Sequence, residues 1–118
     1  MDADTAIDCS QRAAGVAMGR LDPVARSLTG SRGVVHLTQL EALVLQLLAR
    51  GEGPCSREYI YHKVFGRDWC PTDRSLDVHV AHLRRKLGAA GLAPPLIDSI
   101  RSRGYRLRAP VCVENTSR

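Results

Sequence analysis

The chain has 118 residues, a length that suits a single domain with its own hydrophobic core. Hydrophobic residues make up 44% of the chain and aromatic residues only 4%, so leucine, valine and isoleucine should form that core. The formal net charge is +5, and the excess lies between Thr72 and Arg108, which hold eight basic and three acidic residues against nine of each elsewhere. A basic region of this kind predicts an anionic partner, nucleic acid first and an anionic membrane surface second.

The same sequence disfavours several other classes of protein. Residues 1–15 lack the cationic and apolar regions of a signal peptide, and no apolar run is long enough to span a bilayer. We therefore expect a cytoplasmic protein that does not bind membranes. No paired carboxylates, no Ser/His/Asp arrangement and no phosphate-cradling glycine loop is present, which predicts neither an enzyme nor a cofactor site. His79 and His82 raise the possibility of zinc, but the cysteines lack paired spacing, so we expect no metal site.

The N-terminal part divides into two segments. Residues 1–15 are small, polar and acidic, and we interpret them as a disordered tail or a linker. From Val16 to Leu37, short apolar pieces alternate with turn signals such as Asp22-Pro23. This pattern predicts small antiparallel strands.

A first helix is expected after Leu37. Thr38 and Glu41 have the spacing of a capping box, and Leu37 is placed to act as a hydrophobic staple. Gly51 should end the helix. The spacing predicts one buried face, formed by Leu40, Leu43, Val44, Leu47 and Leu48.

Two further helices are expected. Ser56 should cap the second helix and Gly66 should end it, with Ile60, Val64 and Phe65 on its buried side. The third helix should span residues 73–87, with Asp73 or Thr72 as its cap and Gly88 as its terminator. One of its faces is apolar, formed by Leu76, Val80, Leu83 and Leu87. The opposite face carries Arg74, Val78, Ala81, His82 and Arg85, with Arg84 on one flank.

The last predicted element is a hairpin. Residues 96–101 and 105–108 read as two strands joined by a turn at 102–104, where Gly104 supplies a positive φ angle. Residues 110–118 read as a C-terminal tail. Four arginines follow the hairpin at nearly every second position: Arg101, Arg103, Arg106 and Arg108.

In their order and spacing, these segments resemble the winged helix-turn-helix output domain of the OmpR/PhoB family of bacterial response regulators. The resemblance covers about residues 16–109 and rests on four stretches: "LTQLEALVLQLLA", "SREYIYHKVFG", "DRSLDVHVAHLRRKLG" and "IRSRGYRL". It implies an α+β fold with three helices, a small N-terminal antiparallel sheet and a C-terminal hairpin wing. It also implies a sequence-specific DNA-binding transcription regulator.

The resemblance further implies which residues contact double-stranded DNA. The third helix would enter the major groove, where Arg74 and Ser75 would hold phosphate, Val78 would touch a thymine methyl group, and His82 and Arg85 would reach base edges or backbone. Arg84 would bind phosphate from the flank of this helix. The wing (96–108) would lie at the minor groove. Its contacts would come from Ser99, Arg101, Arg103 and Tyr105.

Three features of the sequence depart from the usual pattern of the family. The wing reads Arg101-Ser102-Arg103-Gly104-Tyr105 where the family has R-G-x-G-Y, and Ala81 and His82 replace frequent bases on the third helix. Phe65 stands where tryptophan is common. The preferred DNA sequence therefore cannot be taken over from a relative.

The resemblance also implies partners beyond DNA. Two copies would bind tandem half-sites about 10–10.5 bp apart, and the loop 66–72 would meet RNA polymerase. For Trp69 in that loop, we favour a simpler role as a lid over the edge of the core. A receiver domain is absent from these residues, so the chain is expected to be either a stand-alone regulator or an excised output domain.

Two other functions are compatible with the charge. The winged helix could be a protein-interaction module whose wing and third helix meet an acidic protein, such as RNA polymerase or a regulatory partner. Ala81 and His82, which stand where the family often has stronger bases, support this alternative. It could also coat nucleic acid without sequence preference. Retention of one duplex sequence over others would separate these possibilities.

Overall fold

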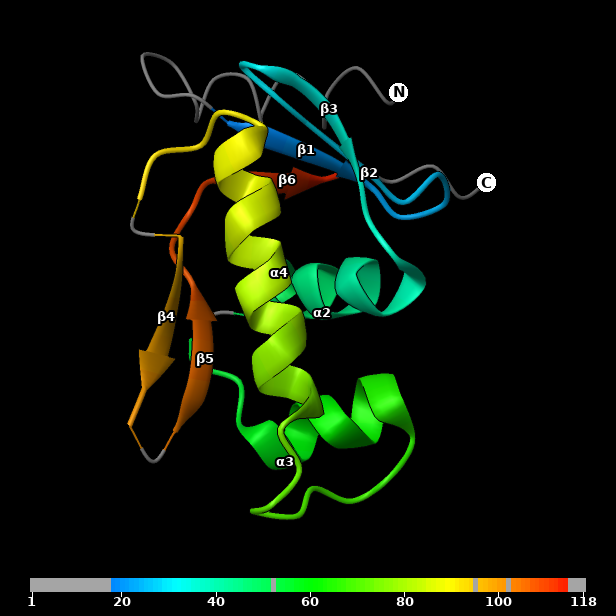
Figure 1. Cartoon of the computed structure of the whole chain (residues 1–118), viewed down its shortest axis with the longest axis vertical. Coiled ribbons are helices and arrows are strands. Elements are labelled where there is room, and N and C mark those ends of the chain that lie inside the picture. Colours follow the sequence, from blue (N-terminus) through cyan, green and yellow to red (C-terminus); the bar gives the residue numbers. More distant parts are fainter. Residues whose placement is uncertain (1–17, 52, 95, 102, 115–118) are drawn as a thin grey trace.

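The computed structural model describes residues 18–51, 53–94, 96–101 and 103–114. The predicted tail, residues 1–15, lies outside this part of the chain. The chain begins with three strands, followed by three short helical segments and then one long helix. A hairpin and a last strand complete the fold. A small sheet lies at one end of the long axis and the short helix α3 (Arg57–Ile60) at the other (Figure 1). This is the expected α+β architecture.

The sheet has four strands: β1 (Gly19–Asp22), β2 (Ser27–Gly30), β3 (Gly33–His36) and β6 (Val111–Val113). Their order is β3-β2-β1-β6. The first three strands pair antiparallel, as the sequence predicts, whereas β6 pairs with β1 in parallel. The expected tail at 110–118 is therefore partly wrong, because residues 111–113 complete the sheet. Pairing of Gly19 with Val111 holds this strand in place.

The helices are α2 (Gln39–Arg50), α3, a π-helical turn η1 (Tyr61–Phe65) and α4 (Ser75–Ala89). The predicted caps are confirmed for the first two: Thr38 and Glu41 form the capping box, and Ser56 accepts a hydrogen bond from Tyr59 N. Gly66 follows η1 in a left-handed conformation, where the absence of a Cβ removes the steric cost.

The buried face of α2 differs from the predicted stripe. Its buried residues are Glu41, Ala42, Val44, Leu45 and Leu48. Leu43, expected in the core, is 38% exposed. The buried face is rotated because α2 packs against α4, β6, η1 and the strand β5 (Gly104–Leu107) together. A pattern with a single buried face does not anticipate several packing partners.

The long helix α4 begins and ends later than predicted. Arg74 is its N-cap residue, and Asp73 accepts a hydrogen bond from Ser75 N at 2.9 Å. The helix runs through Gly88, which was expected to end it, and stops near Gly91, whose φ is +105°. The carbonyl of Ala90, at the C-terminal end of α4, has no partner within the helix. It accepts a hydrogen bond from Arg32 N, in the turn between β2 and β3, at 2.9 Å.

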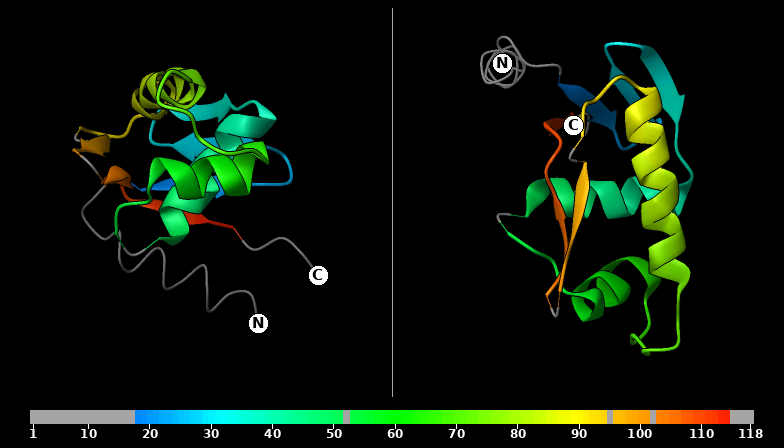
Figure 2. Two further views of the ribbon diagram at one scale, coloured as in Figure 1. Left: turned by 90° about the horizontal axis from the view of Figure 1, so that it is seen from below. Right: turned by 60° about the vertical axis from the view of Figure 1, so that its left-hand side comes forward.

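The hairpin, or wing, consists of β4 (Ile97–Ile100) and β5 (Gly104–Leu107), paired antiparallel. It flanks α4 in both views of the molecule (Figures 1 and 2). The core below it includes the apolar face of α4, as predicted: Leu76, Val80, Leu83 and Leu87 are each at most 1% exposed. Among the described residues, no helix has the length and apolar character that crossing a membrane requires.

Gly104 permits the wing to approach the chain before α3. Its φ is +114°, and a Cβ placed there would lie 1.9 Å from the Cys55 carbonyl oxygen. The neighbouring Tyr105 exchanges two backbone hydrogen bonds with Cys55, at 2.8 and 3.0 Å. Only a residue without a side chain allows this bridge and this backbone conformation together.

Gly104→Ala should therefore lower the free energy of unfolding by about 2–4 kcal/mol, measured by urea denaturation. Gly88→Ala is the matched control, because Gly88 lies inside α4 with ordinary φ and open space around its Cα. That substitution should be neutral or stabilise by up to about 1 kcal/mol. Equal effects of the two substitutions would contradict the close approach.

Asp73 should make stability depend on acid pH. Hydrogen bonds from the Ser75 backbone and side chain, with a smaller contribution from Arg67, lower the pKa of Asp73 from 3.8 to about 2. A carboxyl with a lowered folded-state pKa stabilises the fold above its unfolded pKa and loses this contribution as the pH falls through the folded value.

Asp73→Asn should therefore be less stable than the unmodified protein near neutral pH, and this difference should close between pH 3.8 and about 2. The measurement is the urea midpoint of both proteins across that pH range. A difference that stays constant down to pH 2 would mean that the charge of Asp73 contributes nothing to folding.

Candidate nucleic-acid interface

The exposed side of α4 is a narrow stripe opposite the buried face. Arg74, Val78, Ala81 and Arg85 are all exposed, with the same spacing of four, three and four residues as the buried leucines and valine. Val78 is 49% exposed, which is unusual for a large apolar side chain in a helix with a well-packed core. The stripe therefore presents two arginines that flank a small apolar surface.

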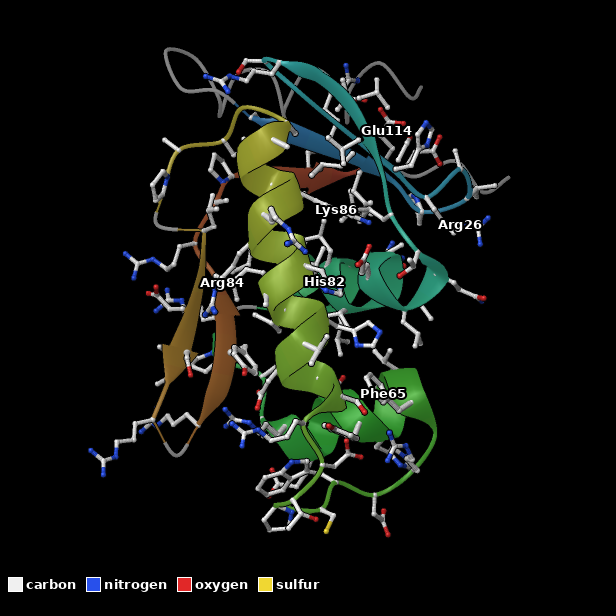
Figure 3. The ribbon with its side chains drawn as sticks, viewed as in Figure 1. Arg26, Phe65, His82, Arg84, Lys86 and Glu114 are labelled. Atoms are coloured by element: carbon white, nitrogen blue, oxygen red, sulfur yellow. The ribbon has the colours of Figure 1, made fainter. Side chains whose placement is uncertain are left out.

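Ser75 and His82 border this stripe. Ser75 is the first residue of α4 and is partly buried. The side chain of His82 is 45% exposed, and its Nδ1 atom lies 3.6 Å from Glu41 Oε2 on α2. His82 and Lys86 point from α4 toward α2, whereas Arg84 points toward the wing (Figure 3).

The wing contributes the second group of cations. Ser99, Arg101 and Arg103 are exposed, and Arg103 N donates to Ile100 O at 2.9 Å across the turn. Ser102 lies outside the described residues. Arg108, although exposed, is paired with Asp98 at 2.7 Å. Within the described part of the chain, Arg85, Arg101 and Arg103 take part in no ion pair, so their charges are available to an anionic ligand.

Tyr105, expected to contact DNA, is instead a structural residue. It is only 4% exposed. Its hydroxyl donates to Asp77 Oδ1 and accepts from Arg57 Nη2 at 3.4 Å. Burial, and then the Asp77 carboxylate, raise the pKa of the Tyr105 phenol. Tyr105 thus joins the wing to α3 and α4, and its burial leaves little of its side chain for a DNA contact.

Arg84, predicted to bind phosphate, also makes a contact within the protein. Its Nε and Nη2 atoms donate to the Ile97 carbonyl oxygen at 3.0 and 2.8 Å. This pair of bonds ties α4 to the first strand of the wing, and it draws the guanidinium away from the exposed stripe. Arg84 therefore sets the spacing between helix and wing.

The sequence analysis missed Arg57. Its guanidinium lies 4.9 Å from the centre of the Tyr105 ring and 3.8 Å from Asp77, and its side chain is 28% exposed. Asp77 also pairs with Arg74 at 3.6 Å, so this carboxylate is a partner for two arginines. No local sequence pattern predicts this role of Arg57, because its partners Asp77 and Tyr105 lie 20 and 48 positions further along the chain.

The histidines of α4 do not form a metal site with the described residues. His79 Nδ1 lies 2.7 Å from the Ser75 carbonyl oxygen, and its ring packs edge-on against Phe65. Among the described residues, no group of three His, Cys, Asp or Glu side chains is placed to hold a metal ion.

A helix with an exposed basic stripe, flanked by a hairpin with a cationic turn, defines a winged-helix nucleic-acid-binding domain. The chain belongs to the family described as "Transcriptional regulatory protein, C terminal", whose model matches residues 31–107. This is the OmpR/PhoB-type output domain that the sequence resembles, a DNA-binding fold and not an enzyme.

Several characterised proteins are similar to this chain. Response regulator MprA of Mycobacterium sp. (strain KMS) is 38% identical over 89 residues, which cover 75% of this chain and 38% of that protein. The chain therefore spans less than half the length of this relative. The DNA-binding domain of CpxR from E. coli is 32% identical, with a TM-score of 0.66, and the match covers 77% of this chain and 87% of that one.

A third relative was solved with its ligand. The RstA DNA-binding domain of Klebsiella pneumoniae, in complex with the RstA box, is 29% identical with a TM-score of 0.63. The match covers 74% of this chain and 87% of that domain. Its fold agrees with the strands, helices and wing described above.

The structural role of Tyr105 leads to a test. Tyr105→Phe should lower the free energy of unfolding by about 1–2 kcal/mol, because Asp77 and Arg57 lose their hydroxyl partner. Tyr59→Phe is the control, since Tyr59 is 45% exposed and should change stability by less than about 0.5 kcal/mol. Urea denaturation measures both. Weaker DNA binding by Tyr105→Phe at unchanged stability would instead restore Tyr105 as a direct contact.

Proposed function

We propose that this chain is the sequence-specific DNA-binding domain of a transcription regulator, with α4 in the major groove and the wing turn at the adjacent minor groove. The observation that carries the proposal is the pairing of the exposed stripe on α4 with the unpaired arginines of the wing. Arg84 fixes the two elements to each other through Ile97. Membership of the family supports it, as does the RstA domain's complex with the RstA box.

Each exposed residue has a role that its chemistry suits. Arg74 and Ser75, at the start of α4, would hold phosphate, because the helix N-terminus favours an anion. Val78 would touch a thymine methyl group, and His82 and Arg85 would reach base edges. In the wing, Ser99, Arg101 and Arg103 would follow the minor groove, whose negative potential attracts arginine.

The protein-interaction alternative is not favoured. It rested on Ala81 and His82 in place of stronger bases, but the arginines on either side, Arg74 and Arg85, are exposed. The family to which the chain belongs points the same way.

Two finer features belong to the same proposal. Two copies would bind tandem half-sites about 10–10.5 bp apart, one turn of the double helix. The loop 66–72 would contact RNA polymerase, because most of it is exposed, including Asp68 and Cys70. Trp69 packs partly buried against the core, which matches the predicted lid.

Selection from a randomised duplex library at about 150 mM salt tests the proposal. Enrichment of one motif, and of a direct repeat in particular, is the expected result. Retention of duplexes without any motif would instead indicate non-specific coating. No retention at all would contradict DNA binding and revive the protein partner.

Arg101→Gln should weaken binding to all duplexes and reduce the slope of log K against log salt by about one, because one phosphate contact is lost. Arg26→Gln is the control, since it removes the same charge from the turn after β1, far from the wing (Figure 3). Fluorescence anisotropy at several salt concentrations measures both slopes. An unchanged slope for Arg101→Gln, or an equal change for Arg26→Gln, would remove Arg101 from the interface.

A further inference from the structure

The outer face of α2 carries leucines that the core does not bury. Leu43 is 38% exposed, and Leu47 is only partly buried. Together with Gln39 they form a ridge whose residues are four positions apart along the helix. A second helix packs against such a ridge by laying its own side chains in the grooves on either side. The outer face of α2 therefore has the form of a helix-packing surface.

Two adjacent hollows lie beside this ridge and share Leu43 as a lining residue. One extends to the turn between β1 and β2, and the other extends to η1. We call the two hollows together the α2 groove. Val24, Leu43, Leu47 and Val64 give it an apolar floor. Val24 is 75% exposed, the highest value among the large apolar side chains of the described residues.

The rim of the α2 groove is cationic. Arg26, Arg50 and Lys63 line it and are exposed. Within the described part of the chain, none of the three takes part in an ion pair, and no acidic residue lines either hollow. The nearby Asp22 is engaged in its own turn, where its carboxylate accepts from Val24 N at 3.0 Å. The groove therefore combines an apolar floor with positive charge that the protein itself does not neutralise.

The backbone of Arg26 gives a second reason to look for a ligand here. Its φ is +56°, and among the described residues it is the one non-glycine residue with a positive φ. The turn is held by Leu37 N, which donates to the Arg26 carbonyl oxygen at 2.8 Å. Glycine or asparagine adopts this conformation at lower cost than arginine. The fold alone thus does not favour an arginine at this position.

We propose that the α2 groove docks an acidic amphipathic helix of a partner protein. Its apolar side chains would cover Leu43 and Leu47, and its carboxylates would pair with the cations of the rim. No strand residue lines the groove, so the ligand has no sheet edge to extend, whereas the ridge on α2 suits a helix. A nucleic-acid backbone would use the cations but would leave the apolar floor without a partner.

The α2 groove is separate from the candidate nucleic-acid interface. None of its lining residues belongs to α4 or to the wing. The turn that carries Arg26 lies on the opposite side of α4 from the wing (Figure 3). A partner in the groove therefore leaves the DNA surface free, and the inference does not rest on DNA binding.

The test is selection of peptides from a random library displayed on phage, with the whole chain as bait. The peptides should be about 16 residues long, enough for about four turns of helix. The expected result is enrichment of peptides with apolar residues three or four positions apart and with Asp or Glu between them. Fluorescence anisotropy then measures the affinity of one labelled, enriched peptide for the protein and its variants.

Two substitutions in the groove should weaken binding of that peptide. Leu43→Gln should weaken it about tenfold, because an apolar contact is lost. Arg50→Glu should weaken it about fivefold or more, because an attraction becomes a repulsion. Val34→Gln and Arg85→Gln are the controls, since both residues are exposed but lie outside the groove, and they should leave the affinity unchanged. Circular dichroism checks that each variant folds, and Arg50→Glu decides the question if Leu43→Gln does not.

Several results would overturn the inference. The absence of acidic, apolar peptides from the selection would exclude the proposed ligand. A peptide weakened by Arg85→Gln but not by Leu43→Gln would lie on α4, and a peptide that a DNA duplex displaces would share the DNA surface. Self-association of the protein that Leu43→Gln abolishes, measured by sedimentation, would assign the groove to a second copy. Tighter peptide binding after replacement of Asp2, Asp4 and Asp8 by asparagine would assign it to the N-terminal segment of this chain.

Discussion

The burial of one face of α4 is the constraint on which the rest of the structure depends. Leu76, Val80, Leu83 and Leu87 are each at most 1% exposed, and removing such side chains from water supplies most of the free energy that holds a helix against its domain. With that face fixed, the helix has no rotational freedom about its axis. The opposite stripe must therefore face outward, and its two arginines and Val78 become the surface that a ligand meets.

Contacts at the ends and sides of α4 turn this orientation into a rigid interface. Leu76 N donates to the buried hydroxyl of Tyr61 at 3.1 Å, which joins the start of the helix to η1. Arg84 ties one side to the wing, and Glu41 of α2 occupies the other side. Tyr105 and Asp77 join the wing to the same helix. Because these polar groups are already engaged, DNA would bind a surface that needs little rearrangement.

Contacts within one element were predictable from the sequence, and contacts between elements were not. The capping box at Thr38, the buried face of α4 and the positive φ of Gly104 follow from spacing and residue type, and the structure confirms them. The burial of Tyr105 depends on its contacts with α3 and α4. These contacts cannot be predicted from the residues next to Tyr105 in the sequence. The strand β6 was missed for the same reason, since three residues form it only by pairing with β1.

Arg84 shows how a correct local pattern can leave the role of a residue open. Its place on the flank of α4 was predicted, but a flank position is equally compatible with phosphate and with the Ile97 carbonyl. The packing of the wing brings two of the guanidinium nitrogens to the Ile97 carbonyl oxygen. Glu41 is the converse case, because the capping box accounts for one of its oxygens and only the fold shows what meets the other.

The central claim is that the exposed stripe of α4 and the turn of the wing form one DNA-binding surface. NMR spectra of the ¹⁵N-labelled protein, recorded as a duplex from the library selection is added, test it most directly. The largest shifts should fall on residues 74–85 of α4 and 99–103 of the wing, with little change on the sheet. Shifts centred on the sheet or on the outer face of α2 around Leu43 would contradict it.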